Sequence, residues 1–243
     1  MEVLSRVEVS MLEFVIMSSS PSSGVPMFEL PLFPLNTVLF PGMPLHLHIF
    51  EERYKKMIQF CLERSVPFGV VLIRQGVEAY GPIAEPYPVG CTARIIEMEP
   101  LSEGRMNIVA VGQERFRTVL LDSRKAAFLT GIVQPFPLSN SNSGALENAG
   151  QRLKPWVKRY LEVLAKSENV KMEVPDIPDD PETLAYLAAI SLQVPNKDKQ
   201  DFLSEESTTD LLEKLLATYR REIALLRAAM ASRPDSVANF SKN

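Results

Sequence analysis

Residues 30–54 read LPLFPLNTVLFPGMPLHLHIFEERY, in which four prolines and one glycine separate short apolar runs. Valine, leucine and phenylalanine around a Pro-Gly pair predict two strands, at residues 37–40 and 45–49, folded back on each other. Proline second and glycine third in Phe40-Pro41-Gly42-Met43 is the pattern of a type II turn. The acidic residues at 51 and 52 suit the positive end of a helix dipole, so a helix is expected to open there.

Further along the chain, three more stretches carry a family resemblance. PLFPL, VLFPG and LHIFEERY in the opening stretch are followed, in order, by PFGVVLI at 67–73, VGCTARI at 89–95 and GRMNIVAVGQERFRTV at 104–119. Together they resemble the LON substrate-binding domain, the N-terminal domain of ATP-dependent Lon proteases, which also occurs as stand-alone bacterial proteins. The resemblance covers about residues 28–230. It implies a six-stranded, PUA-like pseudo-barrel.

The pattern of the first half agrees with a barrel. After a helix at residues 53–64, with apolar positions at helical spacing through Leu62, five apolar runs joined by short turns predict strands. These runs cover residues 68–74, 90–98, 105–112, 114–121 and 127–135. Successive strands with one helix inserted early indicate a small mixed barrel, in an α+β protein, rather than a doubly wound sheet.

The second half is predicted to be helical. The polar run LSNSNSG at 138–144 is typical of a linker, so the β-barrel subdomain is expected at 27–138, the linker at 139–144, and a helical subdomain at 145–232. A tail at 233–243 completes the expected division. The 3.6-residue period from Leu153 to Leu164 predicts one helix, in which Pro155 marks either the first turn or a kink.

Three further helices are expected at 182–192, 197–203 and 208–232. Asp180 can cap the first of them, with Pro181 at the first helical position. Ser207 can cap the long last one, whose wide apolar stripe leaves open a role in self-association. The acidic, proline-rich residues 168–180 before them are expected to form a loop.

The first 26 residues are expected to be a disordered or added extension. The apolar run MLEFVIM at 11–17 is short, is preceded by acidic residues and is interrupted by Glu13, which argues against a secretory signal. The run SSSPSSG at 18–24 has the composition of a flexible linker. No run approaches the roughly 18 apolar residues that a membrane span needs, so no membrane partner is expected.

Composition limits the function further. The 243 residues are 46% hydrophobic, enough for packed cores, and carry a formal net charge of −4. An acidic balance argues against a nucleic-acid partner held by phosphate contacts. Cys61 and Cys91 are too few for a disulfide scaffold and indicate a reducing compartment, so a cytoplasmic location is expected.

Motifs for catalysis are missing from the sequence. There is no G-x-x-x-x-G-K-[ST] phosphate loop, no G-x-S-x-G elbow and no H-E-x-x-H helix. The resemblance places Lon's ATPase module and serine-lysine dyad beyond the domain matched here, so a chain called Lon-like on this basis would lack both activities. We therefore expect no catalytic residue and no cofactor.

Two pairs of side chains are candidates for reactive sites. His46 and His48 lie two apart on a predicted strand near Glu51 and Glu52, so they could bind zinc if another segment supplied a third ligand; the alternative is a solvated outer face. Cys61 and Cys91 lie on apolar faces and are interpreted as core residues rather than nucleophiles.

Arg115 and Arg117 alternate with Phe116 on a predicted strand, so their guanidinium groups share a face. Such a pair could bind carboxylates of an acidic peptide. The alternative is an ordinary solvated face, paired with Glu97, Glu99 or Glu114.

Apolar residues of the opening stretch outnumber the core positions that two short strands offer. Some of them are predicted to line a groove that captures apolar peptide segments, with core packing as the alternative for each. The candidate contacts are Phe33, Leu39, Phe40 and Met43, together with Arg115 and Arg117.

These observations favour a non-catalytic module that binds unfolded or apolar segments of other proteins. The resemblance points the same way, and implies an adaptor in protein quality control with an ATP-dependent protease or a chaperone as partner. The alternative is a small hydrolase or ligand-binding enzyme with its site in a cleft between barrel and helices, where His46, His48 or the arginine pair would supply polar groups.

Overall fold

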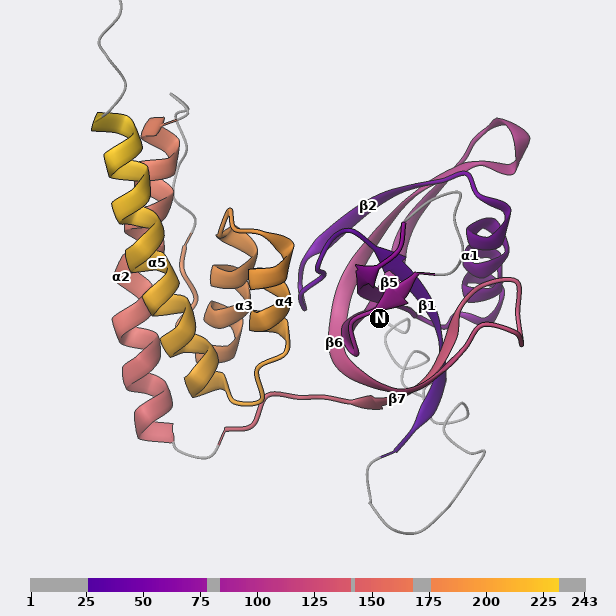
Figure 1. The fold of residues 1–243 in the computed structure, drawn as a ribbon, viewed down its shortest axis with the longest axis horizontal. Coiled ribbons are helices and arrows are strands. Elements are labelled where there is room, and N and C mark those ends of the chain that lie inside the picture. The colour runs from indigo at the N-terminus through magenta and orange to yellow at the C-terminus, as the bar shows by residue number, and fades with distance from the viewer. Residues whose placement is uncertain (1–25, 78–83, 141–142, 168–175, 232–243) are drawn as a thin grey trace, which may run out of the picture. The chain divides into compact units, whose positions relative to one another are not determined.

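The computed structural model describes residues 26–77, 84–140, 143–167 and 176–231 (Figure 1). The chain divides into two compact units. A strand unit takes in residues up to Pro137 together with Val194–Ser204, and a helical unit takes in Leu138–Gln193 and the residues from Glu205 onward. The extension expected at residues 1–26 and the tail expected at 233–243 lie almost entirely outside the described residues.

The strand unit contains one sheet that closes on itself. Its pairings run β1–β7–β6–β5–β3 and return from β3 to β1 through a parallel pair, while β2 is added on β6 and β4 on β3. This confirms the predicted β-rich barrel, although within the described segments the sheet has seven strands rather than six. The elements are β1 (Phe28–Leu35), β2 (Pro44–Ile49), α1 (Glu52–Arg64), β3 (Phe68–Gln75), β4 (Glu85–Pro86), β5 (Val89–Pro100), a 3₁₀ turn (η1, Ser102–Gly104), β6 (Met106–Asp122), β7 (Thr130–Pro135) and α4 (Asn196–Leu203).

The hairpin predicted at the opening stretch is wrong in one arm. Residues 37–40 form no strand, and the first strand is β1, which contains two prolines. β1 accommodates them because β7 pairs with residues 28–31 and β3 with residues 32–35, so that each residue of β1 pairs with one of the two strands and not with both. β2 is confirmed as a strand, but it pairs with β6.

The predicted turn is confirmed, and it is hydrogen-bonded to the backbone of β6. Met43 N–H donates to the Phe40 carbonyl at 3.1 Å, and Gly42 has φ of 76° as the third position of a type II turn requires. Gly42 N–H also donates to the Gly112 carbonyl at 2.9 Å, and Gly112 N–H donates to the Met43 carbonyl at 3.0 Å. The turn is therefore fastened to the middle of β6.

β6 is one strand of 17 residues where two were predicted. The ladder with β5 shifts register between Cys91 and Ala93, next to the position of the predicted break. There the Thr92 hydroxyl accepts from Glu114 N–H at 3.0 Å and lies 3.2 Å from the Glu114 carbonyl, which it can donate to. A side chain thus replaces backbone bonds that the irregularity removes, and the strand continues.

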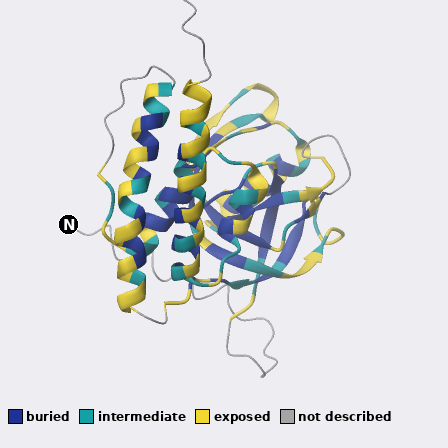
Figure 2. Ribbon diagram, turned by 60° about the vertical axis from the view of Figure 1, so that its left-hand side comes forward, coloured by how far each residue is buried: buried dark blue, intermediate teal, exposed yellow. Residues whose placement is uncertain are grey.

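Apolar side chains gather on both faces of β1 and β3. Leu30 and Leu32 enter one cluster with Phe116 and Val133, while Phe33 enters a larger one that α1 covers. The Phe33 ring stacks on that of Tyr54 in α1 with centroids 4.0 Å apart. In Figure 2 the strands are coloured as buried over much of their length. Leu62, expected on the buried stripe of α1, is 39% exposed instead.

The helical unit consists of α2 (Ser143–Ser167), α3 (Pro181–Ser191) and α5 (Thr208–Ala231). α2 begins inside the predicted linker and runs through Pro155. Asp180 caps α3 as predicted, since its Oδ2 accepts from Thr183 N–H at 2.8 Å. The Ser207 hydroxyl accepts from Asp210 N–H at 3.3 Å at the start of α5, as predicted.

Buried aromatic side chains join these helices. The rings of Tyr160 in α2 and Tyr219 in α5 meet edge to face at 5.2 Å. The Tyr219 hydroxyl donates to the Ala188 carbonyl of α3 at 2.9 Å.

The short helix α4 lies in the strand unit, although the sequence division had placed it in the helical subdomain. The loop predicted at 168–180 is outside the described residues up to 175. No helix within the described segments combines the length and apolar character that a membrane crossing requires.

Candidate functional site

A shallow groove lies beside β2 and the start of α1, with a volume of about 150 Å³. We call it the β2 groove. Phe33 and Tyr54, which stack on each other, contribute apolar surface, and the partly exposed side chains come from β2 and the residues after it. Its lining residues are Phe33, Leu35, His46, Leu47, His48, Ile49, Phe50, Glu51 and Tyr54.

Both histidines of the chain line this groove. They are exposed on the same face of β2, as their spacing predicted, and the His48 ring lies 2.8 Å from the Asn107 side-chain oxygen through Nδ1. Phe50, 37% exposed, stacks on His48 with ring centroids 5.9 Å apart. Within the described residues, no group of three His, Cys, Asp or Glu side chains is arranged to hold a metal ion. The groove therefore offers aromatic and apolar surface with polar groups.

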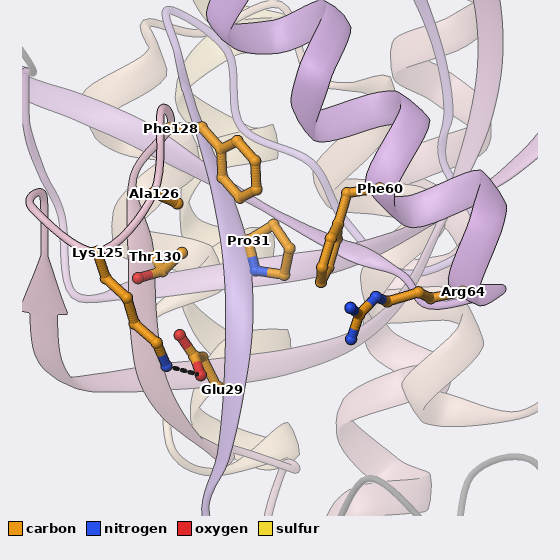
Figure 3. A pocket seen from close by; sticks show the side chains of 8 residues that line it. All are labelled: Glu29, Pro31, Phe60, Arg64, Lys125, Ala126, Phe128 and Thr130. Atoms are coloured by element: carbon orange, nitrogen blue, oxygen red, sulfur yellow. Dashed lines mark hydrogen bonds and ion pairs between the residues drawn. The ribbon is translucent and has the colours of Figure 1, made fainter.

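A second and larger depression, with a volume of about 250 Å³, lies between the C-terminal half of α1, the start of β1 and the segment before β7 (Figure 3). We call it the α1 pocket. Its apolar walls are Pro31, Phe60 and Phe128, and the two phenylalanine rings lie 5.9 Å apart. Its other lining residues are Glu29, Arg64, Lys125, Ala126 and Thr130.

Charged side chains surround these apolar walls. Lys125 Nζ pairs with Glu29 Oε2 at 2.6 Å, while the Arg64 guanidinium stacks on Phe60 with Cζ 4.6 Å from the ring centroid. Sequence reasoning missed this pocket, because its residues come from three distant segments and none of them carries a local motif.

The apolar candidates of the opening stretch lie mostly in the core. Phe33, Leu39 and Phe40 are 4%, 1% and 0% exposed. The structure therefore shows core packing, which was the alternative to a place in an open groove. Of these three, Phe33 also lines the β2 groove. Met43 is half-buried and packs against the same core. The short strands expected around the turn offered too few core positions, but β1, β3 and α1 supply the rest.

The two arginines of β6 do share a face, as predicted. Both guanidinium groups lie over the ring of Phe136, with Cζ at 4.7 Å for Arg115 and 4.1 Å for Arg117. Arg115 is buried, and its Nη1 donates to the Leu203 carbonyl of α4 at 2.6 Å. A buried arginine that caps α4 has a structural role, and only Arg117 keeps a partly exposed side chain.

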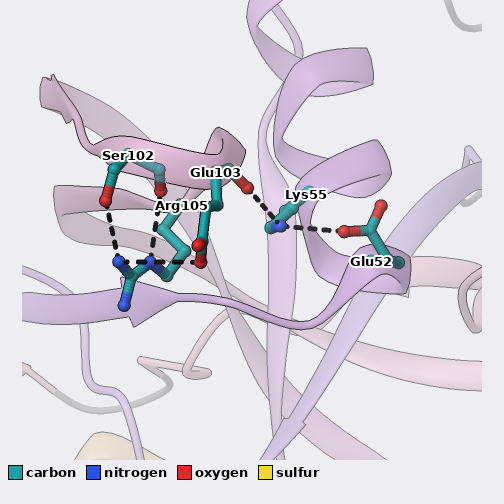
Figure 4. Close-up of polar contacts among 5 residues, drawn as sticks. All are labelled: Glu52, Lys55, Ser102, Glu103 and Arg105. Atoms are coloured by element: carbon teal, nitrogen blue, oxygen red, sulfur yellow. Dashed lines mark hydrogen bonds and ion pairs between the residues drawn. The ribbon is translucent and has the colours of Figure 1, made fainter.

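Polar contacts fasten the turn between β5 and β6 to α1 (Figure 4). Lys55 Nζ donates to the Glu103 carbonyl and to Glu52 Oε1, both at 2.8 Å. The hydrogen bond and charge of Lys55 hold the pKa of the Glu52 carboxyl below its ordinary value. Arg105 binds back to Ser102 within the turn, with Nη2 2.8 Å from the Ser102 hydroxyl.

The two thiols are core residues, as interpreted from the sequence. Cys61 and Cys91 are 1% and 0% exposed. Burial raises the pKa of each thiol to about 12, so neither is a thiolate at neutral pH. This disfavours nucleophilic chemistry at either cysteine.

The strand order and helices define a fold of the Lon N-terminal-domain class. A Lon N-terminal domain protein from Xanthomonas campestris matches with a TM-score of 0.57 at 24% identity, over 78% of this chain and 97% of that one. The N-terminal domain of a Mycobacterium avium complex Lon protease gives a TM-score of 0.57 at 17% identity, over 79% and 98% of the two chains.

Sequence comparison then establishes the family. Residues 29–219 match the ATP-dependent protease La (LON) substrate-binding domain, and the chain belongs to this family. It is 27% identical over 200 residues to Lon protease 2 of Myxococcus xanthus and 28% identical over 205 residues to a Lon protease of Brevibacillus choshinensis. Each match covers 82% of this chain but 24% and 25% of the relative, so the chain spans about a quarter of the length of these proteins.

Proposed function

We propose that this protein is a non-catalytic module that binds segments of other proteins, and that its clients are unfolded or carry exposed apolar residues. The match to a substrate-binding domain over residues 29–219 is the observation that carries this proposal. As an adaptor in protein quality control, it would act in the cytoplasm and present clients to an ATP-dependent protease or a chaperone.

The β2 groove is the proposed contact surface. It combines aromatic side chains with two histidines and a carboxylate, and such mixed surfaces suit segments that expose an apolar side chain from a polar backbone. Phe50 is the most exposed large apolar residue of the groove. Phe33 would serve as part of the floor. Met43 and Arg117 do not line the groove, but both are partly exposed in the strand unit and remain candidates for contact.

A pair of variants tests this surface. Phe50→Ser removes an exposed ring from the groove, and Leu120→Ser removes an equally apolar side chain, 62% exposed, from β6. In fluorescence anisotropy with a labelled, permanently unfolded protein, Phe50→Ser should weaken binding roughly fivefold or more, because an interface aromatic is often an anchor. Leu120→Ser should leave it unchanged. Equal affinities for wild type and Phe50→Ser would remove the β2 groove from the proposal.

The enzymatic alternative has no comparable support. The two histidines lie on one strand without a third metal ligand among the described side chains, and the thiols are buried and protonated. We therefore propose binding alone.

A further inference from the structure

The α1 pocket carries an excess of positive charge on apolar walls, in a chain whose formal net charge is −4. Two cations and one carboxylate line it. The ion pair of 2.6 Å between Lys125 and Glu29 neutralises one cation. The Thr130 hydroxyl donates to the Asp122 carbonyl at 3.2 Å, so its donor is already used. The remaining charge belongs to Arg64.

Arg64 is exposed at the end of α1 and extends toward the pocket (Figure 3). Among the residues that the structure describes, its guanidinium stacks on Phe60 and no carboxylate pairs with it. Stacking holds the planar guanidinium by its face and leaves the N–H groups at its edge available to an acceptor. A carboxylate is the acceptor whose geometry this group matches best.

The size of the pocket limits what it can hold. About 250 Å³ is below the roughly 300–1,000 Å³ typical of pockets for drug-sized ligands and cofactors. Two rings 5.9 Å apart and a proline offer a surface for one large apolar side chain. Figure 3 shows the Arg64 side chain next to Phe60, on the side of that ring away from Phe128.

We propose that the α1 pocket binds a segment of a client protein in which a large apolar residue is followed by an aspartate or glutamate. The apolar side chain packs on Pro31, Phe60 and Phe128, and the carboxylate binds Arg64. This inference rests on the proposed function and adds to it a second site with a defined preference. Glu29 weakens binding of such a segment, because its carboxylate forms an ion pair with Lys125 and so neutralises that cation.

Short labelled peptides on a Gly-Ser background test the preference with the full-length protein. One peptide contains Phe-Asp, one Phe-Asn and one Ala-Asp. In fluorescence anisotropy, Phe-Asp should bind roughly fivefold more tightly than either other peptide, and the difference from Phe-Asn should shrink as salt is raised.

Two substitutions of opposite expected effect identify the residues. Arg64→Gln should abolish the difference between Phe-Asp and Phe-Asn, whereas Glu29→Gln should increase affinity for Phe-Asp by releasing Lys125. Arg94→Gln removes an exposed arginine from β5 and should change nothing. Thermal unfolding of each variant confirms that it is folded, so that a loss in Arg64→Gln reports on binding rather than on structure.

Each outcome separates this site from the wider function. If Phe-Asp and Phe-Asn bind equally, or Arg64→Gln keeps their difference, the pocket proposal is wrong even where unfolded proteins still bind. If the difference is lost in Phe50→Ser but kept in Arg64→Gln, the acidic segment occupies the β2 groove and the pocket proposal is again wrong. If neither peptides nor unfolded proteins bind, both proposals fail.

Discussion

Gly112 is the point at which β6 holds the turn at Phe40–Met43. A Cβ atom at this position would lie 2.2 Å from the Phe40 carbonyl oxygen, which is backbone and cannot move aside without breaking the turn. We expect Gly112→Ala to lower the free energy of unfolding by roughly 2–4 kcal/mol, through strain in a packed core. Urea denaturation followed by circular dichroism measures this.

Gly150 provides the matched control for this substitution. It lies inside α2, and the nearest atoms to a Cβ there are side-chain carbons at 3.7 Å, an ordinary contact. Gly150→Ala should therefore be neutral or stabilise by up to about 1 kcal/mol, because alanine favours helix. If Gly112→Ala proves as mild as Gly150→Ala, the turn is not docked as described.

Asp180 makes the N-terminal cap of α3, and its replacement should destabilise the helical unit. Hydrogen bonds from the Thr183 side chain and backbone hold the pKa of the Asp180 carboxyl below its ordinary value. Asp180→Ala should cost about 1 kcal/mol at neutral pH, the typical value of a cap. Asp176→Ala, at an exposed position before the helix, should cost much less.

The pH dependence of this cap has a definite sign. A carboxyl whose pKa is lower in the folded state stabilises fully above its unfolded pKa of about 3.9, and the gain is lost as pH falls through the folded value. The difference between wild type and Asp180→Ala should therefore shrink below about pH 4. A constant difference down to acid pH would show that the carboxylate charge does not contribute.

Sequence predicted those residue-level features in which both partners are close along the chain. The Asp180 cap and the turn from Phe40 to Met43 were predicted and are confirmed, and each joins residues three positions apart. The roles of Arg115 could not be predicted in the same way. Its partner Leu203 is 88 residues away, and a charged side chain gives no sign that it will be buried under a helix.

At the scale of elements, the alternation of apolar residues located most strands but could not assign their pairings. β2 was predicted at the right residues, yet its partner is β6 rather than the neighbouring segment. β1 was missed because prolines usually interrupt strands. Proline has no backbone N–H, so it interrupts a strand only at a position where that N–H would have to donate to a neighbouring strand. β6 was divided in two because Thr92, a residue of another strand, bridges its irregularity.

The contact of Lys55 with the β5–β6 turn predicts a local change in dynamics. Lys55→Met keeps the aliphatic stem but removes the hydrogen bond to the Glu103 carbonyl. Amide exchange in residues 101–105 should become faster, while global stability changes by less than about 1 kcal/mol, since the contact is exposed. Lys56→Met, at the adjacent exposed position, should leave exchange in this turn unchanged. Equal exchange in all three proteins would mean that Lys55 does not restrain the turn.

At the scale of the whole molecule, segments distant in sequence complete each compact unit. Helix α4 was assigned to the helical half because its period is helical, but two hydrogen bonds join it to strands of the strand unit. Arg115 of β6 donates to the Leu203 carbonyl of α4, and Gln200 of α4 donates to the Val89 carbonyl of β5. The α1 pocket arises in the same way, from three segments that the barrel brings together. Neither could be derived from local patterns, whereas the fold class could, because motifs in a fixed order carry it.

Thiol labelling reports on the folding of the strand unit. Cys61 and Cys91 are the only cysteines of the chain, both buried with pKa raised to about 12. At about pH 8, where an ordinary thiol reacts readily, alkylation of the native protein should be at least about a hundredfold slower than in denaturant. Mass spectrometry counts the modified thiols. Rapid modification of one cysteine under native conditions would indicate a local opening near that residue.

We propose above that this LON-family chain binds proteins through the segments that they expose when unfolded. Isothermal calorimetry tests this with the full-length protein and one disulfide-containing protein in two forms: native, and reduced and carboxymethylated so that it stays unfolded. We expect measurable binding of the unfolded form and none of the native form. Binding of neither form, or equal binding of both, would contradict it.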